Sequence, residues 1–178
     1  MADKSAQFEL YRRYYKAMYN TAFRILNNSF EAEDIMQESF LNAYTKLSAF
    51  KAENENDNIG AIFGAWLKRI VINNSLTYLK NCNKFNMVPL DKVKETTSIK
   101  IADEKDYSKL KIKELLEALQ LLKENYKLIL TLYYIEGYDY QEIAQIINTT
   151  YQNVRTQVFR AKQKLRENLE LNYEKIHR

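Results

Sequence analysis

Side chains that can pair with nucleic-acid bases cluster near the C-terminal end of the chain. They are amides, a hydroxyl and a guanidinium: Gln152, Asn153, Arg155, Thr156 and Gln157. Gln, Asn and Arg can pair with base edges in the major groove of DNA. If this segment forms the first turns of a helix, its chemistry is suited to reading a duplex.

Positive charges continue along the same segment, at Arg160, Lys162 and Lys164. No acidic residue occurs between Glu142 and Glu167. Cations without nearby counter-charges are suited to phosphate contacts. We therefore expect base contacts at the start of the segment and phosphate contacts farther along.

Two helices and a tight turn are needed to position these groups. Asp139, with Glu142 three residues on, resembles a capping box that begins the first helix. The turn is predicted at 148–150, where Asn148 tolerates a left-handed backbone. The inward-facing residues are predicted to be Ile143, Ala144, Ile146 and Ile147 in the first helix, and Val154, Val158, Phe159 and Leu165 in the second. This pattern is typical of a helix-turn-helix; the alternative is an ordinary helical hairpin with a solvated basic face.

Composition predicts an all-α protein. Three Gly and one Pro among 178 residues are too few for a turn-rich or sheet-rich fold. Hydrophobic residues make up 46% of the chain, enough for real cores, and the net charge is a modest +4. The position of the charges therefore matters more than their total.

Several function classes are excluded by the scarcity of Cys and His. Cys82 and His177 are the only residues of their types, so the chain has no zinc finger, no Cys–His dyad and no Ser–His–Asp triad. We expect no enzyme activity, no metal and no cofactor. The N-terminus lacks the apolar core of a signal peptide, and the apolar runs are too short to span a membrane. These features predict a cytoplasmic protein without membrane insertion.

Helical spacing divides the chain into two units. In the first unit we predict helices at about 8–26, 30–50 and 62–79, with a polar loop at 51–60. A stretch that contains the only proline, Pro89, reads as a linker, and helical spacing returns at Leu110. The expected domains are 1–83 and 111–178, joined by the linker 84–110.

The last predicted helix of the first unit is basic, because no acidic residue occurs from Asn58 to Leu90. Its polar and charged residues fall on or near one helical face: Lys68, Arg69, Asn73, Asn74 and Lys80. Such a face is suited to the phosphates and bases of a nucleic-acid strand. The alternative for Asn73 is an internal role, in which it caps or cross-links helices.

The C-terminal unit resembles region 4 of the extracytoplasmic-function (ECF) sigma factors. The matching motifs are Glu136-Gly137, Glu142-Ile143-Ala144, Val154-Arg155-Thr156 and Arg160-Ala161-Lys162. The chain departs from the family pattern in having Lys123 for Pro, Asn148 for Gly and Asn153 for Thr or Ser. The last departure bears on which bases are preferred.

The N-terminal unit resembles region 2 of the same family. The stretch Ala32 to Phe40 reads AEDIMQESF, and the stretch Trp66 to Asn73 reads WLKRIVIN. Thr77 and Lys80 stand where the family often has Asp and Arg. Both motif blocks occur in the family order, with the linker between them.

The resemblance implies three binding surfaces. The helix from about Gln152 would bind the −35 promoter element. Region 2 would melt the −10 element and hold a flipped base in the loop before Trp66, where Asn56, Asn58 and Phe63 are candidates; the alternative for Phe63 is the core. The residues that would bind the clamp of core RNA polymerase are Asp34, Gln37 and Glu38, although Asp34 also suits a helix N-terminus. Because family members are often held inactive by an anti-sigma protein, such a factor joins polymerase and promoter DNA among the candidate partners.

Two other functions remain as alternatives. A dimeric helix-turn-helix regulator would bind duplex DNA without polymerase, at a two-fold-symmetric site. An enzyme with a helical DNA-binding appendage would need a catalytic cluster. Only Asp34 and Glu38, four residues apart on one helix, offer even a weak metal site.

Overall fold

A computed structural model describes residues 4–50, 58–82 and 112–176. Within these ranges the regular structure is entirely helical, in agreement with the predicted all-α class. The chain divides into two compact units, Met1–Phe85 and Asn86–Arg178. The predicted linker, Asn56 and His177 lie outside the described residues.

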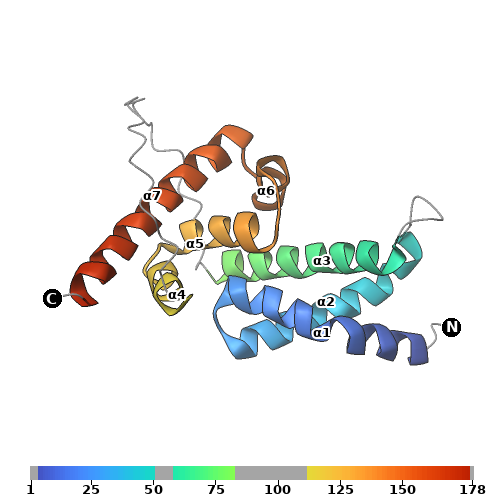
Figure 1. Cartoon of the computed structure of the whole chain (residues 1–178). Coiled ribbons are helices and arrows are strands. Elements are labelled where there is room, and N and C mark those ends of the chain that lie inside the picture. Colours follow the sequence, from blue (N-terminus) through green and yellow to red (C-terminus); the bar gives the residue numbers. More distant parts are fainter. Residues whose placement is uncertain (1–3, 51–57, 83–111, 177–178) are drawn as a thin grey trace. The chain divides into compact units, whose positions relative to one another are not determined.

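The first unit is a bundle of three long helices, α1 (Lys4–Leu26), α2 (Ser29–Thr45) and α3 (Ile59–Asn81), with a short 3₁₀ turn η1 (Leu47–Ala49) after α2. Figure 1 shows α1 and α2 beside α3, and each helix contacts the other two. The apolar side chains at the centre of the bundle with no more than 3% exposure include Ala22, Met36, Leu67, Val71, Ile72 and Leu76.

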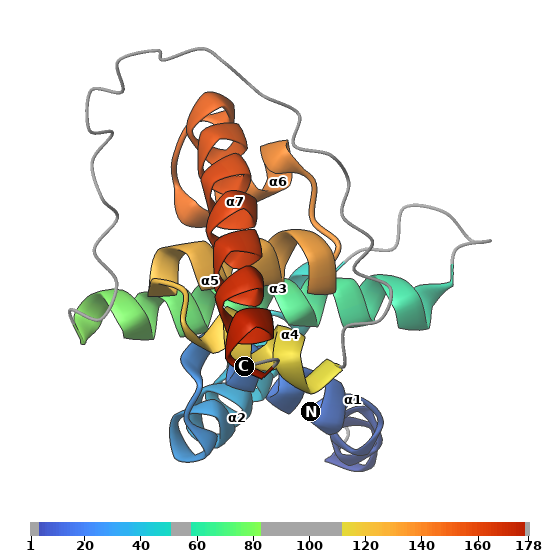
Figure 2. The ribbon, with the colours of Figure 1, turned by 60° about the vertical axis from the view of Figure 1, so that its left-hand side comes forward.

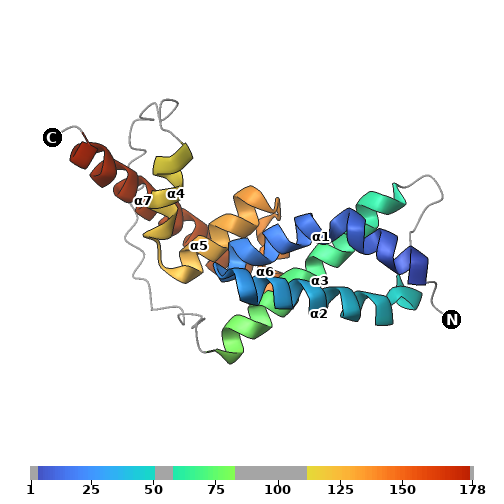
Figure 3. The same ribbon diagram turned by 90° about the horizontal axis from the view of Figure 1, so that it is seen from below.

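Two asparagines make the sharp connection between α1 and α2, which lie side by side in Figure 3. Asn27 adopts a left-handed backbone with φ of 54°. The Asn28 side chain then caps α2, accepting from the backbone N–H groups of Phe30 at 3.0 Å and Glu31 at 3.3 Å. The predicted break after Leu26 is thus explained by backbone geometry that Asn tolerates better than most residues.

Aromatic side chains fill one end of the first unit. The second helix ends at Thr45 rather than at the predicted Phe50. The intervening turn η1 places the Phe50 ring 5.6 Å from Phe63 and 5.3 Å from Trp66. A continuous helix would have carried Phe50 onward along the helix axis, so the earlier end of α2 serves this aromatic packing.

Small residues at the start of α3 let α1 approach closely. The Tyr14 hydroxyl donates to the Gly60 carbonyl oxygen at 2.7 Å. A Cβ atom on Gly64 would lie 3.1 Å from the Tyr14 ring, closer than ordinary van der Waals contact. Two of the three glycines of the chain therefore stand where the α1–α3 contact requires them.

The second unit contains α4 (Ile112–Gln120), α5 (Glu124–Leu130), a π-helical turn η2 (Thr131–Ile135), α6 (Tyr140–Ile147) and α7 (Tyr151–Ile176). The long helix α7 contacts α4, α5 and α6, as Figure 2 shows. The core side chains that are exposed by no more than 1% include Ala118, Ile129, Leu132, Ile143, Val154, Val158 and Ala161. A buried amide, Asn168, ties α4 to α7 by donating to the Ala118 carbonyl at 3.2 Å.

One predicted core position in α7 is wrong. Phe159 is 51% exposed, and Ala161 occupies the inward position instead with 0% exposure. Since successive helical residues are rotated by about 100°, Phe159 lies about 140° around the helix from Val154, whereas Val158 and Ala161 stay within about 40° of it. All four inward positions predicted for α6 are confirmed, because Ile143, Ala144, Ile146 and Ile147 are buried.

Candidate nucleic-acid interface

The helix-turn-helix begins with a complete capping box at α6. The Asp139 carboxylate accepts from the backbone N–H groups of Gln141 at 2.7 Å and Glu142 at 2.8 Å. The Glu142 carboxylate in turn accepts from the Asp139 N–H at 2.8 Å. Gly137, with φ of +81°, lies between the end of η2 and this cap. These bonds satisfy backbone donors that a helix start leaves without intrahelical partners.

The turn between α6 and α7 is short and polar. Asn148 has φ of 56°, the left-handed conformation predicted from its type. The Thr150 hydroxyl accepts from the backbone N–H of Asn153 at 3.2 Å and so caps α7. The predicted helix-turn-helix is confirmed, and its second helix starts at Tyr151.

The predicted base-contacting residues all lie in the first two turns of α7. Gln152 and Arg155 are exposed, and Thr156 is half-buried with its hydroxyl donating to the Gln152 carbonyl at 2.9 Å. Asn153 and Gln157 are half-buried and bonded to each other, with Gln157 Nε2 3.0 Å from Asn153 Oδ1. The start of α7 thus carries exposed polar side chains beside two amides that are hydrogen-bonded to each other.

The three predicted phosphate contacts differ in their surroundings. Arg160 is half-buried. Lys164 forms an exposed ion pair with Glu167 at 2.8 Å, of a kind that contributes little to stability. Lys162 lies over two aromatic rings, 5.3 Å from the centroid of Tyr133 and 5.1 Å from that of Tyr134.

Tyrosines near Lys162 form a cluster that sequence reasoning missed. The wide turn η2 closes with a bond from the Glu136 N–H to the Thr131 carbonyl at 3.0 Å. This five-residue spacing lets the adjacent Tyr133 and Tyr134 both reach Lys162. Partial burial acts to lower the pKa of Lys162, but the Tyr134 hydroxyl and the neighbouring phenols outweigh it and raise that pKa, so the ammonium stays charged.

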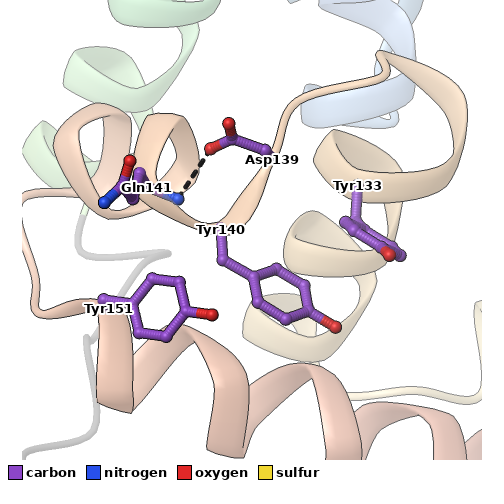
Figure 4. A pocket seen from close by; sticks show the side chains of 5 residues that line it. All are labelled: Tyr133, Asp139, Tyr140, Gln141 and Tyr151. Atoms are coloured by element: carbon purple, nitrogen blue, oxygen red, sulfur yellow. Dashed lines mark hydrogen bonds between the residues drawn. The ribbon is translucent and has the colours of Figure 1, made fainter.

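A shallow pocket of about 440 Å³ lies between η2 and the starts of α6 and α7. It is lined by Tyr133, Asp139, Tyr140, Gln141 and Tyr151, which Figure 4 shows from close by. The Tyr140 ring lies 5.0 Å from Tyr133 and 5.9 Å from Tyr151, centroid to centroid, and is tilted against both rings. Burial, followed by a hydrogen bond with Tyr133, raises the pKa of Tyr140, so its phenol is neutral at physiological pH. The only sequence signal for this pocket was the local abundance of tyrosine.

The first unit separates the predicted −10 residues into different roles. Asn58 caps α3, accepting from the Ala61 N–H at 3.1 Å. Phe63 is only 4% exposed and packs 5.3 Å from Tyr14 and 5.6 Å from Trp66. Burial removes Phe63 from the residues that can contact a base, and the core alternative is correct for it.

The polar and basic face of α3 contains fewer residues than predicted. Asn73 and Lys80 are exposed, and the half-buried Arg69 lies on the same stripe, four residues before Asn73. Lys68 is half-buried and rotated by about 100° from Arg69. Asn74 turns inward, where its Nδ2 donates to the Ser39 hydroxyl oxygen at 3.0 Å. The internal cross-link suggested for Asn73 is therefore made by Asn74, which is a correction to the predicted site.

The predicted polymerase contacts, Asp34, Gln37 and Glu38, are all exposed on α2. Two large apolar side chains lie on the same face of the helix: Phe30 is 81% exposed and Leu41 is 65% exposed. Sequence reasoning missed them as surface residues, although both are out of step with the buried period of α2. Among the described residues there is no group of three or more His, Cys, Asp or Glu that could hold a metal, so the Asp34–Glu38 pair has no third ligand there.

No described helix is both long enough and apolar enough to cross a membrane.

Two family models match the chain. The one described as Sigma-70 region 2 matches residues 10–84, which include most of α1 and all of α2 and α3. The one described as Sigma-70, region 4 matches residues 112–165, from α4 into α7.

Relatives of similar length are described as ECF RNA polymerase sigma factors. The chain is 26% identical over 159 residues to the ECF RNA polymerase sigma factor SigM of Bacillus subtilis, covering 89% of this chain and 91% of the relative. It is 26% identical over 176 residues to SigW of the same organism, covering 94% and 90%. Among solved structures, the sigma factor RpoE from Bartonella quintana, crystallised with the anti-sigma factor NepR, superposes with a TM-score of 0.58 at 20% identity, covering 94% of this chain and 98% of that one. At that identity the likeness establishes a shared fold.

Proposed function

The chain belongs to the extracytoplasmic-function family of RNA polymerase sigma factors, and from that premise we propose how its two units divide the work of initiation. A sigma factor of this family binds core RNA polymerase, recognises the −35 and −10 promoter elements and initiates transcription of a specific regulon. We assign the polymerase clamp and the −10 element to residues 1–83 and the −35 element to residues 111–178. Residues 84–110 connect the two.

The proposal for the −35 element rests on α7. The single observation that carries it is the capped turn that presents Gln152 and Arg155, both exposed, in the first turns of the second helix of a helix-turn-helix. In this motif those turns enter the major groove. Gln152, Asn153, Arg155, Thr156 and Gln157 then contact bases, and Arg160 and Lys164 contact phosphates. Lys162, which lies over Tyr133 and Tyr134, supports the helix.

The −10 element is assigned to α3 and the residues just before it. Arg69, Asn73 and Lys80 form the stripe that faces the separated strand, with Lys68 on its flank. Asn58 at the helix start and Asn56, which lies outside the described residues, remain candidates for a flipped base. The energy of unstacking a base is a few kcal/mol and must be offset by its pocket.

The polymerase clamp is assigned to the outer face of α2. Carboxylates at Asp34 and Glu38 and the Gln37 amide lie between the exposed Phe30 and Leu41. Apolar side chains among charges give such a surface both buried area and orientation. The face therefore combines the features that a protein partner needs, whereas the stripe on α3 is basic.

The chemistry of transcription belongs to the polymerase under this proposal, so the chain itself needs no catalytic group, metal or cofactor. Because polymerase and genome are inside the cell, the site of action is the cytoplasm. The RpoE of Bartonella quintana was solved in complex with the anti-sigma factor NepR. CnrH, which has a TM-score of 0.55 at 19% identity and covers 96% of this chain and 91% of that one, was solved in complex with the cytosolic domain of CnrY. We propose that an anti-sigma factor likewise binds this chain.

Binding to core polymerase, measured by fluorescence anisotropy of the labelled chain, tests the clamp assignment. We expect the double variant Gln37→Ala/Glu38→Ala to weaken binding at least tenfold, and Leu41→Ala to weaken it as well, because hot-spot truncations cost about 2 kcal/mol or more. Glu9→Gln is the matched control, since it removes one carboxylate from an exposed position on α1. Equal binding by the double variant and the control would contradict the assignment, and duplex binding without any binding to polymerase would favour the dimeric regulator.

A further inference from the structure

The outer face of α1 carries cations without matching acidic residues. No acidic residue occurs from Leu10 to Phe30, although this stretch contains four Arg and Lys residues. Three of them, Arg12, Arg13 and Lys16, are exposed. The surfaces assigned above to the first unit lie on α2 and α3, so this helix has no role in them.

Aromatic side chains and two of these cations share one stripe along the helix. At about 100° per residue, its members fall within about 80° around the helix axis, and at about 1.5 Å per residue they extend over about 22 Å. Phe8 is 66% exposed and Phe23 is 40% exposed, whereas Tyr19 is half-buried. We call the following five residues the α1 stripe: Phe8, Arg12, Lys16, Tyr19 and Phe23.

Core packing does not account for the exposed rings of the stripe. The core face of α1 includes Met18 and Ala22, and each lies at least about 100° around the helix from Phe23. A ring that serves the core of this unit behaves differently, since Tyr11 packs 4.9 Å from Phe40 of α2. The position of Phe23 therefore suits a contact outside the bundle.

Tyr19 and Phe23 form a flat pair beside the cations. Their ring centroids are 6.0 Å apart and their planes are inclined by only 15°. Arg12, Lys16 and Tyr19 follow one another at spacings of four and three residues, which makes them neighbours on the helix surface. Arg12 lies 3.9 Å from Glu9, but with side chains 71% and 67% exposed this ion pair contributes little and leaves Arg12 available to a ligand.

Unpaired nucleotides match the rings and the charges together. Proteins that bind single strands stack bases on aromatic side chains and track the backbone with cations. The bases of a duplex present only their edges in the grooves, so exposed rings suit a separated strand better. A helix that lies on a membrane keeps its cations and its aromatic residues on different faces, whereas the α1 stripe combines them on one face.

We propose that the α1 stripe binds single-stranded nucleic acid. Phe8 and Phe23 stack on bases, Tyr19 supports the Phe23 ring, and Arg12 and Lys16 contact phosphates. The stripe is a second strand-binding surface of the first unit, in addition to the one proposed on α3. It goes beyond the proposed −10 role, and the experiment below treats the two helices separately.

Fluorescence anisotropy of labelled single strands, titrated with the full chain, measures this binding. Strands of about 12 nucleotides lie within the usual range of site sizes. Phe23→Ala should weaken binding by about fivefold or more, the lower end of what stacking of one base provides, and Phe23→Tyr should restore it because the ring is kept. The same strands made as DNA and as RNA distinguish a separated promoter strand from a transcript.

The cations are tested by the dependence of binding on salt. Arg12→Gln/Lys16→Gln should lower the slope of log affinity against log salt concentration by about 1.4, which is about 0.7 for each phosphate contact on a single strand. Because both cations are exposed, this variant leaves the core intact. Arg13→Gln is the matched control, since it removes an exposed cation about 100° around the helix from Arg12 and should leave the slope unchanged.

Wild-type affinity in Phe23→Ala, or equal losses in Arg13→Gln and Arg12→Gln, would overturn the proposal. Competition by polyglutamate as strong as that by unlabelled strand would also overturn it, because polyglutamate has charge but no bases and would identify an acidic protein as the partner. Arg69→Gln/Lys80→Gln tests α3 on its own. Wild-type binding by that variant would contradict the −10 role and leave the stripe standing, whereas a loss confined to that variant would overturn the stripe alone.

Discussion

The capping box of α6 yields a prediction whose size follows from its bonds. Asp139→Ala removes the oxygen that accepts from two backbone donors, at 2.7 and 2.8 Å. Loss of an N-cap side chain costs about 0.5–2 kcal/mol. Loss of a negative charge at a helix N-terminus adds about 0.3–1 kcal/mol. Because one oxygen serves two donors here, we expect the free energy of unfolding of the second unit to fall by about 1–2 kcal/mol.

Thermal unfolding measures this cost, and hydrogen exchange reports on the two units separately. For a domain of 60–100 residues, 1 kcal/mol corresponds to a change in Tm of about 4–8 °C. The transition of α4–α7 should therefore move by roughly that amount or up to twice it, while that of α1–α3 should not move. Asp139→Asn is the matched control, since it keeps an acceptor oxygen and loses only the charge.

The expected order of Tm for the second unit is wild type, then Asp139→Asn, then Asp139→Ala. An Asp139→Ala protein with an unchanged transition would refute the reasoning, because the two short bonds would then contribute nothing to stability. Equal destabilisation by Asn and Ala would show that charge, rather than hydrogen bonding, carries the effect. Glu142→Gln, which keeps an acceptor for the Asp139 N–H, should be close to wild type.

Three further variants test the surfaces and cores assigned above. Phe63→Ala should lower the free energy of unfolding of the first unit by about 3–5 kcal/mol in urea titrations, as expected for a buried aromatic residue; an unchanged unfolding midpoint would contradict its burial. Arg155→Ala should reduce base discrimination in the −35 element by about 1–3 kcal/mol, measured by competition between promoter duplexes, and uniform weakening on all sequences would instead assign Arg155 to phosphate. Lys162→Met should destabilise the second unit by about 0.5–2 kcal/mol through the lost contacts with Tyr133 and Tyr134, with no change in the salt dependence of promoter binding. A decrease of about one unit in the slope of log affinity against log salt concentration for Lys162→Met would instead show that Lys162 contacts a phosphate.

Local signals made the helix-turn-helix predictable from sequence. The capping residues, the left-handed Asn148 and Gly137, and the inner face of α6 each depend on residues within one or two turns of the chain. The predicted helix bounds at residues 26 and 30 likewise bracket the two asparagines that connect α1 and α2. Where neighbouring residues determine the backbone, residue type alone was sufficient.

Contacts between distant segments were not predictable in this way. The tyrosines of η2 meet Lys162 only because a π-helical turn widens the backbone and α7 passes nearby. Asn73 and Asn74 are adjacent and chemically identical, so only the packing of α3 on α2 decides that Asn74 bonds to Ser39. Phe159 was misplaced because an apolar side chain in a helix of apolar and basic residues was assigned to the core, whereas its angle around α7 points it to solvent.

Run-off transcription from fragmented genomic DNA, with purified core polymerase in the presence and absence of the chain, tests whether the chain directs promoter-specific initiation. We expect defined transcripts that require the chain, whose start sites share one element near −10 and another near −35. Arg155→Ala should reduce these transcripts while the protein still binds polymerase. No new transcripts, together with polymerase-independent binding to a two-fold-symmetric duplex, would instead identify a dimeric regulator that does not act as a sigma factor.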